Sequence, residues 1–157
     1  MISDDALAIL QDAAVQLRCV AALSSPDATT VAEGLELLGT LLNQEVSMEE
    51  SGQLCATLRE GGAVELLCAL LVDRTETAVH TGALMVIGNL ASDAVDPDAL
   101  QTKERIRAVD GVGKIAMHLF SQEPEVVFYA CGACMNVCST ISDIASLKEM
   151  GLSLIHI

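Results

Sequence analysis

The sequence has 157 residues, 52% of them hydrophobic, which is enough to bury a core and excludes a disordered chain. Its 22 acidic and 8 basic residues give a formal net charge of −14. Nucleic acids and anionic membrane surfaces are bound through Lys and Arg, so neither is an expected partner.

No targeting or membrane segment is visible. Residues 1–5 are acidic, whereas a signal or transit peptide carries positive charge. The apolar runs at residues 63–72 and 82–91 have about half of the roughly 20 residues that a membrane span needs. We therefore expect a cytosolic or nuclear protein.

In chain order, the pattern predicts helices throughout. The first predicted helix contains Val15 and Cys19, and the second spans residues 29–43 after a turn at 24–27. The next helices are expected in units of three, a short helix, a second helix and a longer third one. Short helices are predicted at residues 48–60, 97–109 and 142–150, each followed by glycine, at Gly61-Gly62, Gly111 and Gly151. Glycine ends a helix because it enters the left-handed conformation without steric cost.

The second and third helices repeat along the chain. The apolar face of the second helix recurs 48 residues later, as Val64, Leu67, Cys68 and Leu71 become Val112, Ile115, Ala116 and Leu119. Residues 82–92 align with 132–142 at a distance of 50, which implies that the connecting turn is two residues longer in the later copy, whose third helix opens at Pro124. A weaker first copy matches Gly39 and Leu41 with Gly88 and Leu90.

This three-helix unit resembles the armadillo repeat. The resemblance lies in EGGAVELLCALL (60–71), ALSSPDATT (22–30) and GALMVIGNLAS (82–92), and it covers roughly residues 10–151. It implies an all-α, right-handed α-solenoid in a domain spanning residues 1–151, with repeats at about 10–45, 48–92 and 98–142 and the start of a fourth at 142–151. HEAT-like repeats are the alternative fold; their units have two helices and lack the Gly-Gly entry.

The last six residues, 152–157, break the repeat pattern. Their sequence, LSLIHI, matches the translation of a transposon end used in sequencing libraries, so we expect a non-native tail and a natural protein that continues past Gly151. A genuine short apolar C-terminus is the alternative.

No pattern of catalytic or cofactor-binding residues is present. Cys131, Cys134 and Cys138 share a helix face, but a structural zinc site needs four ligands, so we interpret them as packing cysteines with a metal or redox site as the alternative. His80, His118 and His156 stand apart from any nucleophile. The acidic residues are expected to solvate the surface. We expect a protein that is not an enzyme and needs no cofactor.

Function is therefore expected on the concave surface of the solenoid, which suits long partners. In armadillo proteins this groove binds extended peptides, often through a ladder of Asn side chains. Asn89 matches the ladder position and Met85 stands where import receptors carry Trp. The flanking copies offer Glu36 and Thr40, and Met135 and Ser139.

The sequence thus predicts a monomeric scaffold that binds a protein or peptide with basic or hydrophobic character. An accessory domain of a larger chaperone or ubiquitin ligase is an alternative. In another alternative, the protein is a structural spacer, and Met85 and Met135 fill gaps in its core.

Overall fold

The computed structural model describes residues 3–5, 8 and 12–150. The expected all-α class is confirmed, because the chain forms helices in this order: α2 (Ala13–Ala22), α3 (Ala28–Leu42), α4 (Met48–Glu60), α5 (Ala63–Asp73), α6 (Thr77–Leu90), α7 (Ala99–Ala108), α8 (Gly111–Ala116), the 3-10 helix η1 (Met117–Phe120), α9 (Pro124–Val137) and α10 (Ile141–Glu149). No helix within these described residues has the length and apolar character needed to cross a membrane. The expected tail at 152–157 lies outside them.

Polar side chains fix where several helices begin. Asp27 accepts a hydrogen bond from the backbone of the first turn of α3. Ser47 and Glu50 form a reciprocal capping box at the start of α4, and Thr140 and Asp143 form another at α10. These side chains satisfy backbone N–H groups that have no partner inside the helix.

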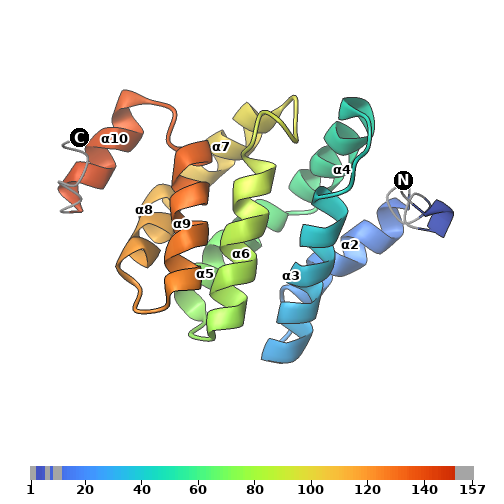
Figure 1. The fold of residues 1–157 in the computed structure, drawn as a ribbon, viewed down its shortest axis with the longest axis horizontal. Coiled ribbons are helices and arrows are strands. Elements are labelled where there is room, and N and C mark those ends of the chain that lie inside the picture. Colours follow the sequence, from blue (N-terminus) through green and yellow to red (C-terminus); the bar gives the residue numbers. More distant parts are fainter. Residues whose placement is uncertain (1–2, 6–7, 9–11, 151–157) are drawn as a thin grey trace.

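The helices form two layers that repeat along the molecule. The longer third helices α3, α6 and α9 lie side by side in one layer, with α6 packed against both neighbours (Figure 1). Helices α4, α5, α7 and α8 lie behind them, and α10 packs on α8 at the C-terminal end (Figure 1). Each unit therefore buries its apolar face mainly against the next unit, as in other solenoids.

Small residues let the third helices approach closely. A Cβ at Gly82 of α6 would lie 2.8 Å from the Cβ of Leu35 on α3. On the other side, the position of a Cβ at Gly88 is 3.6 Å from the backbone of Ala133 on α9. Large aliphatic side chains fill the space between the layers, including Leu38, Leu54, Leu58, Leu67, Leu71, Leu84, Ile87 and Ile106.

The turn between first and second helices is left-handed in both complete copies. Gly62 has φ of 82°, and in the next copy Asp110, not the predicted Gly111, takes this role with φ of 56°. Gly111 is required for a different reason, since a Cβ there would lie 2.7 Å from the carbonyl oxygen of Ile106. Aspartate tolerates the left-handed region better than most residues, so glycine is not essential at position 110.

The register of the last third helix differs from the sequence alignment. Helices α6 and α9 both have 14 residues; they begin 47 residues apart, at Thr77 and Pro124, and end 47 residues apart, at Leu90 and Val137. The turns before them, 74–76 and 121–123, are equally long. The expected two-residue insertion is therefore wrong, and the alignment at a distance of 50 is displaced by three residues.

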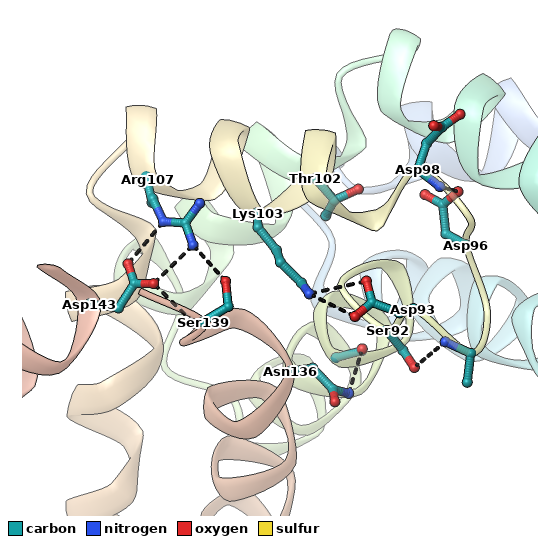
Figure 2. A network of polar contacts seen from close by, with 12 residues as sticks. Ser92, Asp93, Asp96, Asp98, Thr102, Lys103, Arg107, Asn136, Ser139 and Asp143 are labelled. Atoms are coloured by element: carbon teal, nitrogen blue, oxygen red, sulfur yellow. Dashed lines mark hydrogen bonds and ion pairs between the residues drawn. The ribbon is translucent and has the colours of Figure 1, made fainter. Parts of the chain in front are cut away.

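Two acidic residues, Asp96 and Asp143, are buried, contrary to the expectation that acidic side chains solvate the surface. Asp96, in the loop between α6 and α7, is fully buried and pairs with the equally enclosed Arg59 of α4. Arg59 also donates a hydrogen bond to Thr102, at 3.1 Å. In the same loop, Asp93 accepts from Lys103 at 3.2 Å (Figure 2). These pairs anchor the loop, because an unpaired buried charge would be strongly destabilising.

Two histidines meet behind the third-helix layer. His118 lies in η1 and is buried, with Nε2 2.9 Å from the carbonyl oxygen of Leu71, to which it donates as the neutral ring. The ring of His80 in α6 stands 4.4 Å away, centroid to centroid. Burial lowers the pKa of His118 below its usual value, and His80 lowers it further.

We expect Gly62→Ala to lower the free energy of unfolding by about 1–2 kcal/mol, because a side chain is strained in the left-handed region. No atom lies within 4 Å of the added Cβ, so the backbone alone causes the loss. Gly132→Ala is the matched control. A Cβ at Gly132 also has open space, but the backbone there is helical, so this variant should raise the free energy of unfolding by about 0.5–1 kcal/mol. Urea unfolding measures both, and equal stability of Gly62→Ala and wild type would contradict the assignment.

The lowered pKa of His118 predicts a stability that depends on pH. Above the usual value of 6.5 the ring is neutral in both folded and unfolded chains, and its contribution is fully present. As pH falls below 6.5 the unfolded chain takes up the proton first, so the free energy of unfolding should decrease until the folded ring also titrates. His118→Gln keeps a donor for Leu71 but does not titrate. Unfolding at pH 7.5 and 5 should show a larger loss for wild type than for this variant, and equal losses would refute the assignment.

Candidate functional site

The layer of third helices contains a shallow hollow. It has a volume of about 560 Å³ and spans α3, α6 and α9. Its walls come from all three helices: Ala32 and Glu36 from α3, Thr77, Ala78, Thr81, Gly82 and Met85 from α6, and Glu125 and Tyr129 from α9. The close approach of these helices through small residues makes the hollow continuous across the repeats.

The charge of the hollow is negative. Glu36 on α3 and Glu125 on α9 stand on opposite sides of α6, and both side chains are exposed. Among the described residues that line the hollow there is no Lys, Arg or His. Two carboxylates without a local counter-charge attract a cationic group, with a strength that falls as salt screens them.

The floor of the hollow is mainly apolar, but it includes the buried hydroxyl of Thr81. Met85 lies across α3, with its terminal methyl in the space that a side chain at Gly39 would need. Tyr129 adds an aromatic surface from α9. The hydroxyl of Thr81 is buried and has no hydrogen-bond partner among the described residues. A hydroxyl of this kind can bond to a group that enters the hollow.

A row of polar side chains continues the hollow towards the C-terminal ends of the helices. With the distance of 47 residues, Asn136 of α9 occupies the position of Asn89 in α6, and Thr40 is the equivalent in α3. The amide of Asn136 donates to the backbone carbonyl oxygen of Gly88 at 3.0 Å (Figure 2). The hydroxyl of Thr40 donates to the backbone carbonyl oxygen of Glu36, also at 3.0 Å. Within residues 12–150 the amide of Asn89 has no hydrogen-bond partner.

Four of the six groove residues predicted from the sequence lie together in the structure. Glu36 and Met85 line the hollow, and Thr40 and Asn89 each follow one turn later on the same helices. Met135 is 81% exposed on another face of α9. Ser139 lies beyond the end of α9, where its hydroxyl accepts a hydrogen bond from Arg107 at 3.1 Å.

Ser139 belongs to a polar cluster that joins α9 to α10. Arg107 donates two hydrogen bonds to Asp143, each 2.9 Å long, and the backbone N–H of Ser139 donates to the same carboxylate (Figure 2). These bonds, first of all those from Arg107, hold the pKa of Asp143 well below its usual range. Ser139 therefore has a structural role here, and it does not occupy the position of Asn89.

Four residues of the site were missed from the sequence: Thr81, Glu125, Tyr129 and Asn136. A signal for Asn136 was available, since Asn136-Val137-Cys138-Ser139 parallels Asn89-Leu90-Ala91-Ser92 at the distance of 47. Pro124 at the first position of α9 supports the same register. The other three are visible only where helices meet, because nothing in their local sequence marks them.

The site contains no cluster of metal ligands. In the described part of the chain, no three His, Cys, Asp or Glu side chains lie close enough together to hold a metal ion.

No protein-family model and no curated protein matches this sequence. Solved structures do. A designed armadillo repeat protein is similar over 87% of this chain, with a TM-score of 0.68 and 22% identity. An engineered protein is similar over 94%, with a TM-score of 0.72 and 22% identity. A designed armadillo repeat protein in complex with the peptide (KR)4 is similar over 87%, with a TM-score of 0.52 and 20% identity.

These similarities show that the chain has an armadillo-like solenoid fold, and its three-helix units distinguish it from HEAT repeats. The chain spans 52% and 59% of the lengths of the first two of these structures.

Proposed function

We propose that this armadillo-like solenoid is a scaffold that binds an extended peptide segment along α3, α6 and α9. The observation that carries the proposal is the hollow shared by the three helices, which joins neighbouring repeats into one surface. An extended chain can contact several repeats at once, whereas a compact ligand would contact one or two.

The lining favours a basic segment with apolar parts. Glu36 and Glu125 attract cationic side chains, while Met85 and Tyr129 offer apolar surface for the stems of Lys and Arg. The fold-related protein bound to the peptide (KR)4 is a precedent for a basic partner on a solenoid of this shape. The net charge of −14 adds long-range attraction for such a partner.

The row formed by Thr40, Asn89 and Asn136 supplies the second kind of contact. A carboxamide has both a donor and an acceptor, so it can bond to the backbone of an extended peptide independently of the peptide's side chains. The amide of Asn89, which has no hydrogen-bond partner in the described part of the chain, can take this role, and that of Asn136 would exchange its bond to Gly88 for one to the partner.

The first test uses a (KR)4 peptide, titrated against the full chain by fluorescence anisotropy at low and physiological salt. Glu36→Gln and Glu125→Gln should each weaken binding about two- to fivefold, because exposed ion pairs contribute little individually. Glu33→Gln is the matched control, because it removes a carboxylate from the same helix, α3. Glu33 lines a different hollow, beside α2. It should leave the affinity nearly unchanged. Equal losses in all three variants would mean that the peptide binds only to the overall negative charge.

The second test separates backbone recognition from charge. Asn89→Ala should weaken binding of (KR)4 by about 1–3 kcal/mol, the range for a lost hydrogen-bonding partner, and Asn136→Ala should act in the same direction. Ser139→Ala should have no effect. A (KR)4 peptide made of D-amino acids has the same charge but cannot align its backbone with the row, so it should bind more weakly than the L-peptide. Equal affinities of the two peptides would remove the Asn row from the site.

A further inference from the structure

Exposed apolar side chains gather at the C-terminal end of the solenoid. In the described part of the chain, each helix from α2 to α7 exposes at most one large hydrophobic residue. Helices α9 and α10, at one end of the row of helices (Figure 1), and η1 before them expose several: Met117, Phe120, Phe128, Met135, Ile141, Ile144 and Met150. Exposed apolar side chains that gather in one place indicate an interaction surface, whereas single ones are ordinary.

The exposed side of α9 is an uncharged stripe of four residues. Phe128, Cys131, Gly132 and Met135 have the i, i+3, i+4, i+7 spacing of one helix face. All four are exposed, Phe128 by 70% and Met135 by 81%. At 3.6 residues per turn, this α9 stripe lies opposite to Ala133, which is on the side that packs against α6.

The equivalent face is covered in the two earlier third helices. In the alignment of the repeats, Cys131 corresponds to Leu84 of α6 and to Leu35 of α3, and both leucines are fully buried. Met135 corresponds to Gly88 of α6, where a Cβ would lie 3.6 Å from the backbone of α9. Helix α6 thus covers this face of α3, and α9 covers that of α6. Another helix on the α9 stripe would continue the same stacked interface.

The α9 stripe is complementary to itself. Its large side chains, Phe128 and Met135, stand at the two ends, and the small residues Cys131 and Gly132 lie between them. When a second α9 lies antiparallel on the stripe, Phe128 meets Met135 of the second copy and Cys131 meets Gly132. The small residues let the two helices approach closely, and each end gains a sulfur–aromatic contact.

The chain already contains one contact of a methionine over a glycine. The terminal methyl of Met85 on α6 fills the space that a Cβ at Gly39 of α3 would need. At Gly132 the corresponding space is open, because no atom of the described residues lies within 4 Å of the position of a Cβ. A second copy can fill this space with a side chain of its own α9 stripe.

We propose that the α9 stripe is the interface of a symmetric dimer, in which two copies of this chain pack α9 against α9, antiparallel, about a two-fold axis near Cys131 and Gly132. The symmetry makes every contact twice. The stripe can be buried without enclosing a charge, although the net charge of −14 on each copy opposes the approach. One helix from each copy is a small interface, so the dimer is weak, and the monomer expected from the sequence is its dilute form.

The interface leaves the proposed peptide groove accessible. The α9 stripe lies about a quarter of a turn away from Glu125, Tyr129 and Asn136 on the same helix. Salt acts in opposite directions on the two kinds of binding, since it screens the repulsion between acidic copies and the attraction of a basic peptide. Failure of the dimer would therefore leave the groove proposal untouched, and the reverse also holds.

The test is analytical ultracentrifugation of the reduced full chain over a wide range of concentrations, at physiological and at high salt. Wild type should pass from the chain mass of 16.4 kDa to twice that mass, and at lower concentration in high salt. Met135→Glu should raise the dissociation constant of the dimer at least about tenfold, because it would enclose a carboxylate at each end of the interface. Leu100→Glu is the matched control. It places the same charge on α7, at a position that is 59% exposed, and should leave the dissociation constant nearly unchanged.

Gly132→Leu separates the proposed packing from general apolar association. The space around Gly132 is open, so the variant should fold, which circular dichroism checks. Additional apolar surface would strengthen non-specific association. In the proposed dimer the new side chain would keep the two helices apart and raise the dissociation constant at least about tenfold.

Cross-linking with a short bismaleimide locates the interface without relying on a destabilising variant. Wild type should give a link between Cys131 of the two copies, mapped by mass spectrometry, and Cys131→Ser should lose this link. A wild type that stays monomeric would overturn the proposal and leave the stripe to a helix of another protein or of a following repeat. A dimer that Met135→Glu leaves intact, or that Gly132→Leu strengthens, would overturn it as well.

Discussion

The close stacking of α3, α6 and α9 is the constraint on which the rest of the structure depends. No single repeat can bury its apolar face alone, so each third helix must pack against the next. Gly82 allows this between α3 and α6, since a Cβ there would lie only 2.8 Å from the Cβ of Leu35. Because the helices lie so near to one another, their outer faces merge into one surface. The hollow across the three repeats follows from that packing.

Polar pairs, each with a buried member, help to hold the segments that join the repeats, beside the apolar contacts of Val95 and Leu147. Arg59 and Asp96 fasten the loop between α6 and α7 to α4, and Arg107 and Asp143 fasten α10 to α7. Both arginines use a planar guanidinium to satisfy more than one acceptor, which Lys could not do with the same geometry. The long connection after α6 can thereby keep a fixed path, although its sequence is acidic and polar.

Helix α9 serves different purposes on its different faces. One face packs on α6 and contributes Glu125, Tyr129 and Asn136 to the hollow, while Val126, Ala130 and Val137 enter the core. The opposite side carries Cys134 and Cys138, which are half-buried. A single helix can combine these roles because neighbouring positions point about 100° apart, so residues only a few positions apart have unrelated surroundings.

The sequence by itself determined the helical class, the three-helix unit and most helix boundaries. Apolar periodicity, capping residues and glycine turns act within a few residues, and α4 begins and ends where its pattern indicates. It also led to Glu36, Thr40, Met85 and Asn89. What only the tertiary structure decided was the register of α9, the burial of Asp96 and the assembly of the hollow. A shift of three residues keeps an apolar helix face almost in place, so periodicity does not separate distances of 47 and 50. The burial of a carboxylate depends on a partner 37 residues away, and contacts at that distance leave no periodic trace in the local sequence.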